Sequence, residues 1–294
     1  MTRLLRSAAL VAALLFVPQL ARAADEASIK RGEYLFNAGG CDSCHTDRKA
    51  NIPKLAGGPA IKTPFGTFYG PNITPHMERG VGKWSDDDFL RAMRQGIGPD
   101  GTHFFPVFPY TSFTNMTDAD AKDLRAYLAT VPASDRPSKP HDVSFPFNLR
   151  ILQAGWRALN FMPGPFKPDA SKSAEWNRGA YLVTALAHCG ECHTPRTRTG
   201  GIEHDKWFAG NADGPGGDPI PNITPDKDTG IGGWSEDDII QYLSLGLTPD
   251  GDVAGSLMGE VIEFSTSKLT DADRKAIAVY VKSLPPIRNA VKRQ

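Results

Sequence analysis

Two short segments of the chain place a pair of cysteines directly before a histidine. They read CDSCH at residues 41–45 and CGECH at residues 189–193. The CxxCH spacing is typical of covalent haem attachment, because two thiols three positions apart on a turn can each form a thioether to one porphyrin edge. The adjacent histidine then lies under the iron as its proximal ligand. We therefore predict two covalently bound haem c groups, attached through Cys41, Cys44, Cys189 and Cys192, with His45 and His193 as proximal ligands.

Other uses of these cysteines fit the sequence less well. The 294 residues contain only four cysteines, all of them inside the two motifs. Four cysteines in an oxidising compartment are normally read as two disulfides, but two complete CxxCH motifs with no spare cysteine argue against that. A zinc site would need further clusters of cysteine or histidine, which the sequence lacks.

The sequence around each motif is repeated. RGEYLF at residue 31 pairs with RGAYLV at 178, and GPNITPHMERGVGKWSDDD at 70 pairs with IPNITPDKDTGIGGWSEDD at 220. MTDADAKDLRAYL at 116 pairs with LTDADRKAIAVYV at 269, and the offset grows along the chain from 147 to 153. The chain therefore contains two copies of one unit, separated by a few single-residue insertions.

Each copy predicts the same three helices. The first covers about residues 28–38 or 175–186 and leads into CxxCH. The second begins after Ser85 or Ser235, with an acid three residues later, and ends near a glycine. The third begins at Thr117 or Thr270, where Asp120 or Asp273 is expected to complete a capping box. Glycine- and proline-rich loops without strand-like alternation lie between them, so we expect an all-α fold.

This order of features resembles a class I cytochrome c domain in both halves: a helix, CxxCH, a long loop with a methionine, and a last helix. The RGxYL, PNITP, GxGxW, PDG and L/M-TDAD motifs resemble more narrowly the multi-haem cytochrome c subunits of bacterial periplasmic alcohol, gluconate and sorbitol dehydrogenases. Those subunits typically carry three such domains, and this chain has two. The resemblance implies two tandem class I cytochrome c domains, at 24–131 and 173–294, joined by a proline-rich linker at 132–172.

The resemblance also implies a function. We expect a dihaem electron carrier without catalytic residues of its own, taking electrons from a periplasmic dehydrogenase and passing them to a quinone, another cytochrome or an oxidase. The alternative is a dihaem peroxidase or oxidase that uses an open or histidine-ligated first haem. Nucleic acid is not an expected partner, because without residues 1–23 the chain has 30 basic and 33 acidic residues and no basic patch.

The N-terminus predicts export. It has a basic start, an apolar run over residues 8–17 and the small-x-small sequence Ala21-Arg22-Ala23. We expect a signal peptide at 1–23, cleaved near Ala23, and a periplasmic protein that is soluble or peripheral on the outer face of the inner membrane. The apolar run is shorter than the roughly 20 residues that a membrane span needs.

The sixth iron ligand is expected to differ between the halves. Met258 follows Cys192 by 66 residues, just before the last helix, where the cytochrome fold places its axial methionine. At the corresponding place in the first half, the motif of the related subunits resembles YPxMPY. This chain reads FPVFPY there, with Phe108 at the methionine position. An open site remains an alternative to a substitute ligand. The substitutes are His103 and Met116, followed by His76 and Met77.

Two further groups of residues have open roles. Side chains in the repeated loops are candidates for contacts to haem propionates, or else make turn hydrogen bonds and fill the core. They are Asn72, Thr74, Trp84, Asn222, Thr224 and Trp234. The linker contains FPFNLRILQAGWRALNFMPGPF, which predicts a short apolar helix that either packs on its own domains or docks a dehydrogenase or a membrane face.

Overall fold

The computed structural model describes residues 25–291, so the predicted signal peptide at 1–23 lies outside the described residues. A helix over 25–38 comes first. The α-helices that follow are α2 (Cys41–His45), α3 (Asp86–Gln95), α4 (Tyr110–Phe113), α5 (Asp118–Leu128), α6 (Ile151–Asn160), α7 (Ala174–Tyr181), α8 (Gly190–His193), α9 (Glu236–Leu245), α10 (Ser256–Phe264) and α11 (Asp271–Lys282). The π-helical turn η1 (Leu182–Leu186) continues α7, and 3-10 turns are η2 (His204–Lys206), η3 (Pro215–Gly217) and η4 (Thr266–Lys268). Among the described residues, no helix is long and apolar enough to cross a membrane.

The fold is helical but not all-α, which corrects the expectation. A small antiparallel sheet in the order β1-β2-β3 joins β1 (Ala60–Thr63), β2 (Gly66–Tyr69) and β3 (Asp142–Val143). The third strand comes from the segment expected as linker. Sequence patterning missed the sheet because its strands are only two to four residues long, too short for alternation to be visible.

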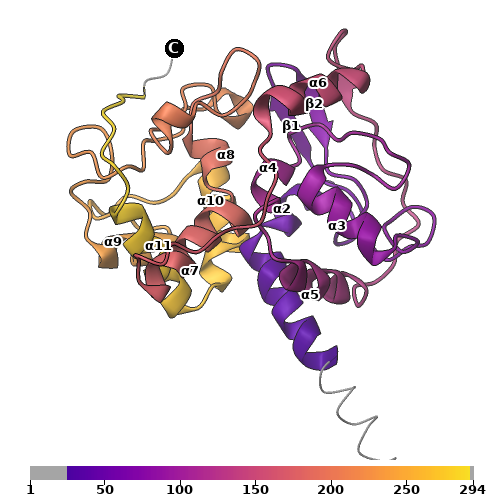
Figure 1. Ribbon diagram of the computed structural model, residues 1–294, viewed down its shortest axis with the longest axis horizontal. Helices are drawn as coiled ribbons and strands as arrows, with labels where there is room; N and C mark the ends of the chain where they lie inside the picture. Colours follow the sequence, from indigo (N-terminus) through magenta and orange to yellow (C-terminus); the bar gives the residue numbers. More distant parts are fainter. Residues whose placement is uncertain (1–24, 292–294) are drawn as a thin grey trace, which may run out of the picture.

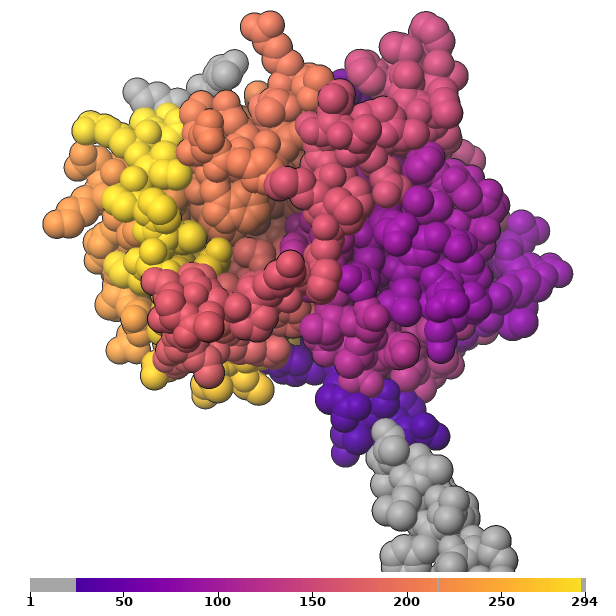
Figure 2. Space-filling model, viewed as in Figure 1, coloured from indigo at the N-terminus to yellow at the C-terminus, as the bar shows by residue number. Residues whose placement is uncertain are grey.

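The two halves lie side by side, with the first half in indigo to magenta and the second in orange to yellow (Figure 1). The segment after α6 runs along the boundary between the halves toward α7 (Figure 2). The predicted domain boundaries at 131 and 172 remain predictions.

The second predicted helix of each copy is confirmed with its ends. Ser85 caps α3 and Ser235 caps α9, and in both cases the acid three residues later completes a capping box. Gly96 and Gly246 end the two helices in the left-handed region, at φ 62° and 75°. Because all these bonds join residues within one turn, the local sequence was enough to predict them.

The glycine of the RGxYL motif permits the helix over 25–38 to cross α5, and α7 to cross α11. A Cβ on Gly32 would lie 1.9 Å from the carbonyl oxygen of Asp123, and one on Gly179 would lie 1.9 Å from that of Ala276. Any side chain larger than hydrogen would force the helices apart. Each crossing fixes the helix that precedes a CxxCH motif against the last helix of its own half.

The capping boxes predicted for α5 and α11 are wrong in one respect. Thr117 and Thr270 cap the helices as expected. The reciprocal hydrogen bond, in which the carboxylate of Asp120 or Asp273 would accept from the threonine N–H, is missing. A tyrosine hydroxyl from the other half takes that place. The Tyr34 hydroxyl accepts from the Thr270 N–H at 3.2 Å and donates to Asp273 Oδ2 at 2.6 Å.

The same bridge occurs in the opposite direction. The Tyr181 hydroxyl accepts from the Thr117 N–H at 3.2 Å and donates to Asp120 Oδ2. Tyr34 and Tyr181 occupy the same place in the repeat, so the halves exchange equivalent tyrosines across a pseudo-two-fold interface, as two subunits of a symmetric dimer do. The interface therefore begins at the starts of α5 and α11.

Tyr34→Phe and Tyr181→Phe should each lower the free energy of unfolding of the haem-loaded protein by about 1–3 kcal/mol, because each leaves a helix-start N–H without a partner and removes one hydrogen bond to a carboxylate. Denaturant unfolding measures the change. Tyr242→Phe is the matched control, since among the described residues its hydroxyl has no hydrogen-bond partner. An equal loss in the control would contradict the role of the exchanged hydroxyls.

The Tyr34 effect should also depend on pH. Burial alone would raise the pKa of Asp273, but hydrogen bonds from Arg178 and Tyr34 outweigh it and hold the pKa below its ordinary value. A carboxylate of this kind stabilises the fold above its ordinary pKa of about 4, and the stabilisation is lost as pH falls through the lowered value. The penalty of Tyr34→Phe should therefore be full near neutral pH and shrink in acid. A penalty independent of pH would contradict the contact with the carboxylate.

Candidate haem-attachment sites

The two CxxCH motifs form short helical turns. α2 holds the first motif, and α8 with its N-cap Cys189 holds the second. None of the four cysteines forms a disulfide. Burial, and then the neighbouring cysteine of the same motif, raises the pKa of Cys41 and Cys189 to about 12. For Cys44 burial and then Cys192 of the other half raise the pKa to about 11. The four sulfurs are thus neutral thiols, available for thioether formation.

The predicted proximal histidines are oriented by a shared contact. The Nδ1 atom of His45 lies 2.8 Å from the carbonyl oxygen of Pro71, and that of His193 lies 2.8 Å from that of Pro221. Both prolines belong to the PNITP motif. Burial lowers the pKa of both imidazoles, which favours the neutral form. A neutral ring whose Nδ1–H donates to a carbonyl has Nε2 free for a metal, the usual arrangement behind a histidine ligand.

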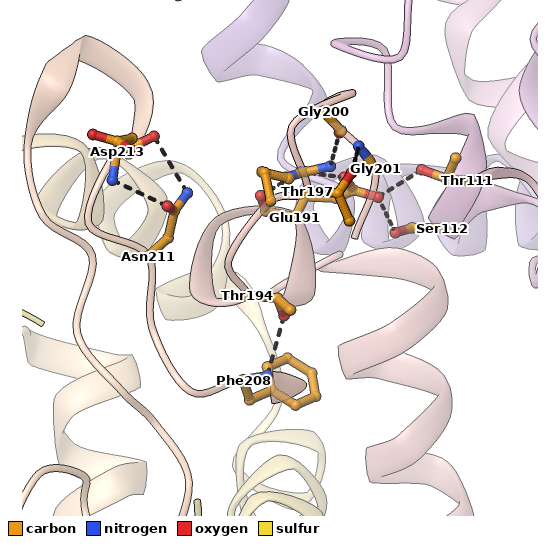
Figure 3. Close-up of polar contacts among 11 residues, drawn as sticks. Thr111, Ser112, Glu191, Thr194, Thr197, Gly200, Gly201, Phe208, Asn211 and Asp213 are labelled. Atoms are coloured by element: carbon orange, nitrogen blue, oxygen red, sulfur yellow. Dashed lines mark hydrogen bonds and ion pairs between the residues drawn. The ribbon is translucent and has the colours of Figure 1, made fainter. Parts of the chain in front are cut away.

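A threonine that follows each motif organises the next loop. Thr46 Oγ1 accepts from the Leu55 N–H at 3.0 Å, and Thr194 Oγ1 accepts from the Phe208 N–H at 3.1 Å (Figure 3). Leu55 and Phe208 are fully buried, and both have φ 63°. Sequence reasoning missed these threonines, although the repeat of a threonine directly after each motif, in CDSCHT and CGECHT, is a signal for them.

The loop threonines and asparagines have protein partners. In each half the asparagine Oδ1 accepts from both the N–H and the hydroxyl of the threonine two residues on. The Asn72 amide donates to the carbonyl oxygens of Ser134 and Arg136, while that of Asn222 donates to Ile287. These bonds attach the segment after the last helix of each half to the PNITP loop. The proposed propionate contacts of Asn72, Thr74, Asn222 and Thr224 stay predictions.

The two loop tryptophans have free donors. Trp84 packs against the core, and the Trp234 ring lies 5.3 Å from that of Tyr242. Among the described residues, neither indole N–H has a hydrogen-bond partner. Both groups therefore remain available to a carboxylate such as a haem propionate.

The candidate sixth ligands lie in different settings. Met258 is on α10 and half-buried, whereas Phe108 is in the turn before α4 and packs on the core. His103 lies in the loop beneath α6, with Nδ1 3.2 Å from Arg157 Nη1. Met116 is 1% exposed, inside the core.

The residues directly before the two attachment turns meet at the interface between the halves. His188, directly before the second motif, has Nε2 3.3 Å from the carbonyl oxygen of Gly39, and Ser265 Oγ donates to that of Ala38 at 3.3 Å. α10 also packs against α2. The structure thus places the approaches to both motifs in direct contact.

A buried carboxylate strengthens this contact. Glu191, inside CGECH, accepts from Thr111 Oγ1 at 2.6 Å and from Ser112 Oγ at 2.8 Å, both on α4 of the first half (Figure 3). Arg196 forms an ion pair with it at 2.7 Å. Burial alone would raise the pKa of Glu191, but Arg196 and the two hydroxyls hold it below its usual range. Sequence reasoning missed this residue because its partners are about 80 positions away.

These residues fit haem c in both halves. Each motif supplies two neutral thiols and a neutral imidazole whose Nε2 is free. Glycines allow the surrounding loops to approach: a Cβ on Gly58 or Gly70 would lie within 1.8 Å of the Cys44 carbonyl oxygen. In the first half, the buried Tyr110 hydroxyl has no partner among the described residues, and burial raises its pKa to about 12.

Comparison with known proteins gives related sequences. A family model described as cytochrome c matches residues 29–132. A diheme cytochrome c-type protein of Cereibacter sphaeroides is 46% identical over 260 residues, which cover 87% of this chain and 86% of that protein. The fructose dehydrogenase cytochrome subunit of Gluconobacter japonicus is 42% identical, over 88% of this chain and 53% of the subunit. The cytochrome c subunit of the quinone alcohol dehydrogenase of Gluconobacter oxydans is 40% identical, over 91% and 57%. The chain thus spans little more than half of these two dehydrogenase subunits.

Replacing Trp84 with Phe should lower the reduction potential of one haem by tens of millivolts, on the order expected for a lost hydrogen bond to an anion near the iron. Trp234→Phe should do the same for the other haem. Spectroelectrochemical titration of each variant measures this. Trp176→Phe is the control, because its indole donates to Ser283. Potentials unchanged by both loop substitutions would contradict the propionate contacts of Trp84 and Trp234.

Proposed function

This chain belongs to the cytochrome c family, and on that premise we propose that it relays electrons from a periplasmic dehydrogenase to a quinone, another cytochrome or an oxidase. The family carries covalently bound haem c and transfers electrons. The haem iron supplies the one-electron chemistry when bound, and the protein supplies attachment, orientation and tuning. The names of the relatives as dehydrogenase cytochrome subunits support the donor.

The proposed iron ligands follow from the site. His45 and His193 bind through Nε2, because a proline carbonyl holds Nδ1 of each ring. Met258 on α10 would supply the sixth ligand in the second half, where a thioether would raise the reduction potential of an electron-carrying iron. Cys41 and Cys44 attach one haem, and Cys189 and Cys192 the other.

The contacts that join the second motif and its approach to the first half carry the proposal of a relay. Glu191 lies between the cysteines of the second motif and binds α4 of the first half, and His188 contacts Gly39. Because the residues directly before the two motifs touch, an electron entering one half would have a short path through the protein to the other. The exchanged tyrosines hold this arrangement from the opposite side of the interface.

Replacing both cysteines of one motif with alanine tests the relay. The variants Cys41→Ala/Cys44→Ala and Cys189→Ala/Cys192→Ala should each retain about half of the haem, measured as pyridine haemochrome. With the dehydrogenase from the native host and its substrate, the intact protein should pass electrons to the acceptor, and both variants should lose at least about tenfold in rate because the chain of carriers is broken. A variant with one haem that relays electrons at the full rate would contradict a two-haem route.

α6 has its polar side inward and its apolar side outward. Its one buried residue is Gln153. Arg150 lies 3.9 Å above the Phe105 ring and donates to the His103 carbonyl oxygen, and Arg157 reaches the His103 imidazole. Large apolar side chains are exposed on and beside the helix, and we call them the α6 face: Phe145, Phe147, Leu149, Ile151, Leu152, Leu159 and Met162.

The dehydrogenase is the proposed occupant of the α6 face. Permanent protein interfaces have apolar cores with few charges. Residues 143–166 contain no acidic residue and only two arginines, both of which turn inward. An anionic lipid surface would instead be attracted by outward cations. α6 also lies directly on the loop that contains His103 and Phe108, so a dehydrogenase bound there would deliver electrons close to the first haem.

Ile151→Glu/Leu159→Glu should abolish this docking. The two side chains are 74% and 81% exposed, so the fold and haem content should not change. Affinity for the dehydrogenase should fall at least about tenfold, because a charge would be buried without a partner. Met77→Glu is the control, at an apolar residue 56% exposed on another loop. Unchanged reduction by the dehydrogenase together with loss of binding to anionic vesicles would make a membrane the occupant and contradict the proposal.

The proposed location is the periplasm. The export signal over residues 1–23 supports it, and covalent haem attachment through thioethers suits an exported chain. Fractionation of the native host, followed by haem staining of the fractions, tests it, and a cytoplasmic haem-free product would contradict it.

A further inference from the structure

The loops that follow α3 and α9 have the same hydrogen-bond register, although their sequences differ. The Phe104 N–H donates to the Gly96 carbonyl oxygen at 2.7 Å, and the Ala254 N–H donates to that of Gly246 at 2.7 Å. The offset between the copies at this point is 150 residues. Four residues further on, the same offset pairs Phe108 with Met258, so the structure supports the correspondence that the sequence predicted.

Phe108 lies in a group of aromatic rings. Its centroid is 5.9 Å from that of Phe104 and 5.7 Å from that of Phe113. A phenyl ring has no lone pair and cannot bind iron. The first half thus places an apolar, aromatic wall where the second half places a thioether.

His103 is not a suitable substitute ligand in this fold. Its Nδ1 lies 3.2 Å from Arg157, and its carbonyl oxygen accepts from Arg150, both on or next to α6. In the second half the equivalent residue is Val253, which is 65% exposed. The side chain at this position is therefore exposed in the second half and covered by Arg157 of α6 in the first.

The other substitutes are also engaged elsewhere. Met116 is 1% exposed and takes the place of Leu269, itself a core residue at 4%, so a packing role accounts for it. His76 Nδ1 accepts from the N–H groups of Glu78 and Arg79 within its own turn. Met77 is 56% exposed.

We infer that the iron held by His45 has no sixth protein ligand and binds a small exogenous molecule, whereas the iron held by His193 is closed by Met258. The ligand class is a diatomic or similarly small molecule, because the surrounding rings of Phe104, Phe108 and Phe113 leave an apolar site. The Tyr110 hydroxyl, two residues after Phe108, is buried and has no hydrogen-bond partner within residues 25–291, so it offers a donor in the same loop. The inference rests on the proposed function only for the presence of two haems.

Carbon monoxide is the probe, added to the reduced protein with both haems attached. Wild type should bind about one molecule per two haems, because only one iron has an open position. Phe108→Met should lose most of this binding, and oxidised protein should gain a second methionine–iron charge-transfer band. Met258→Phe, the matched control at the equivalent position, should bind about two molecules.

The outcomes separate the inference from the proposed function. Wild type that carries two haems and relays electrons but binds no carbon monoxide would overturn the inference alone. If Phe108→Met does not fold, the number of carbon monoxide molecules bound by wild type and by Met258→Phe still tests the inference. Equal binding by wild type and Met258→Phe would also overturn it, whereas wild type without attached haem would contradict the proposed function.

Discussion

Two tyrosine hydroxyls exchanged between the halves are the interaction on which the arrangement of the haem sites depends. Each hydroxyl lies between the first N–H of a last helix and the acid three residues on, so it takes part in the cap of a helix from the other half. Those helices cross the helices over 25–38 and at α7 through glycine contacts. The crossing helices lead directly into α2 and α8, so the interface also sets where the two CxxCH turns lie.

Although the two halves are arranged symmetrically, they differ at positions in and beside the attachment motifs and at the candidate sixth-ligand position. Ser43 of the first motif corresponds to Glu191 of the second, and only Glu191 reaches across to the other half. Gly40 corresponds to His188, and both have positive φ, 58° and 41°. Phe108 corresponds to Met258. Duplication therefore gives two similar attachment sites. A few substitutions give these sites different contacts across the interface and different candidates for the sixth iron ligand.

The sequence predicted features whose bonds join near neighbours. The capping boxes at Ser85 and Ser235 and the CxxCH motifs depend on residues within a few positions, and the structure contains them. It did not predict the Tyr34 bridge, because the partner is 239 residues away. It missed the sheet, whose strands are short and partly drawn from the linker. The sequence also did not predict that α6 turns its polar side inward and its apolar side outward. Periodicity identifies an apolar face but not what covers it.

Magnetic coupling between the two irons tests the central claim most directly. If the exchanged tyrosines and Glu191 hold the two attachment sites close together, electron paramagnetic resonance of the oxidised protein should show spectra broadened by dipolar coupling. The double variant Tyr34→Phe/Tyr181→Phe should reduce that broadening, because the halves are then free to separate. A wild-type spectrum equal to the sum of two isolated haems would contradict the account.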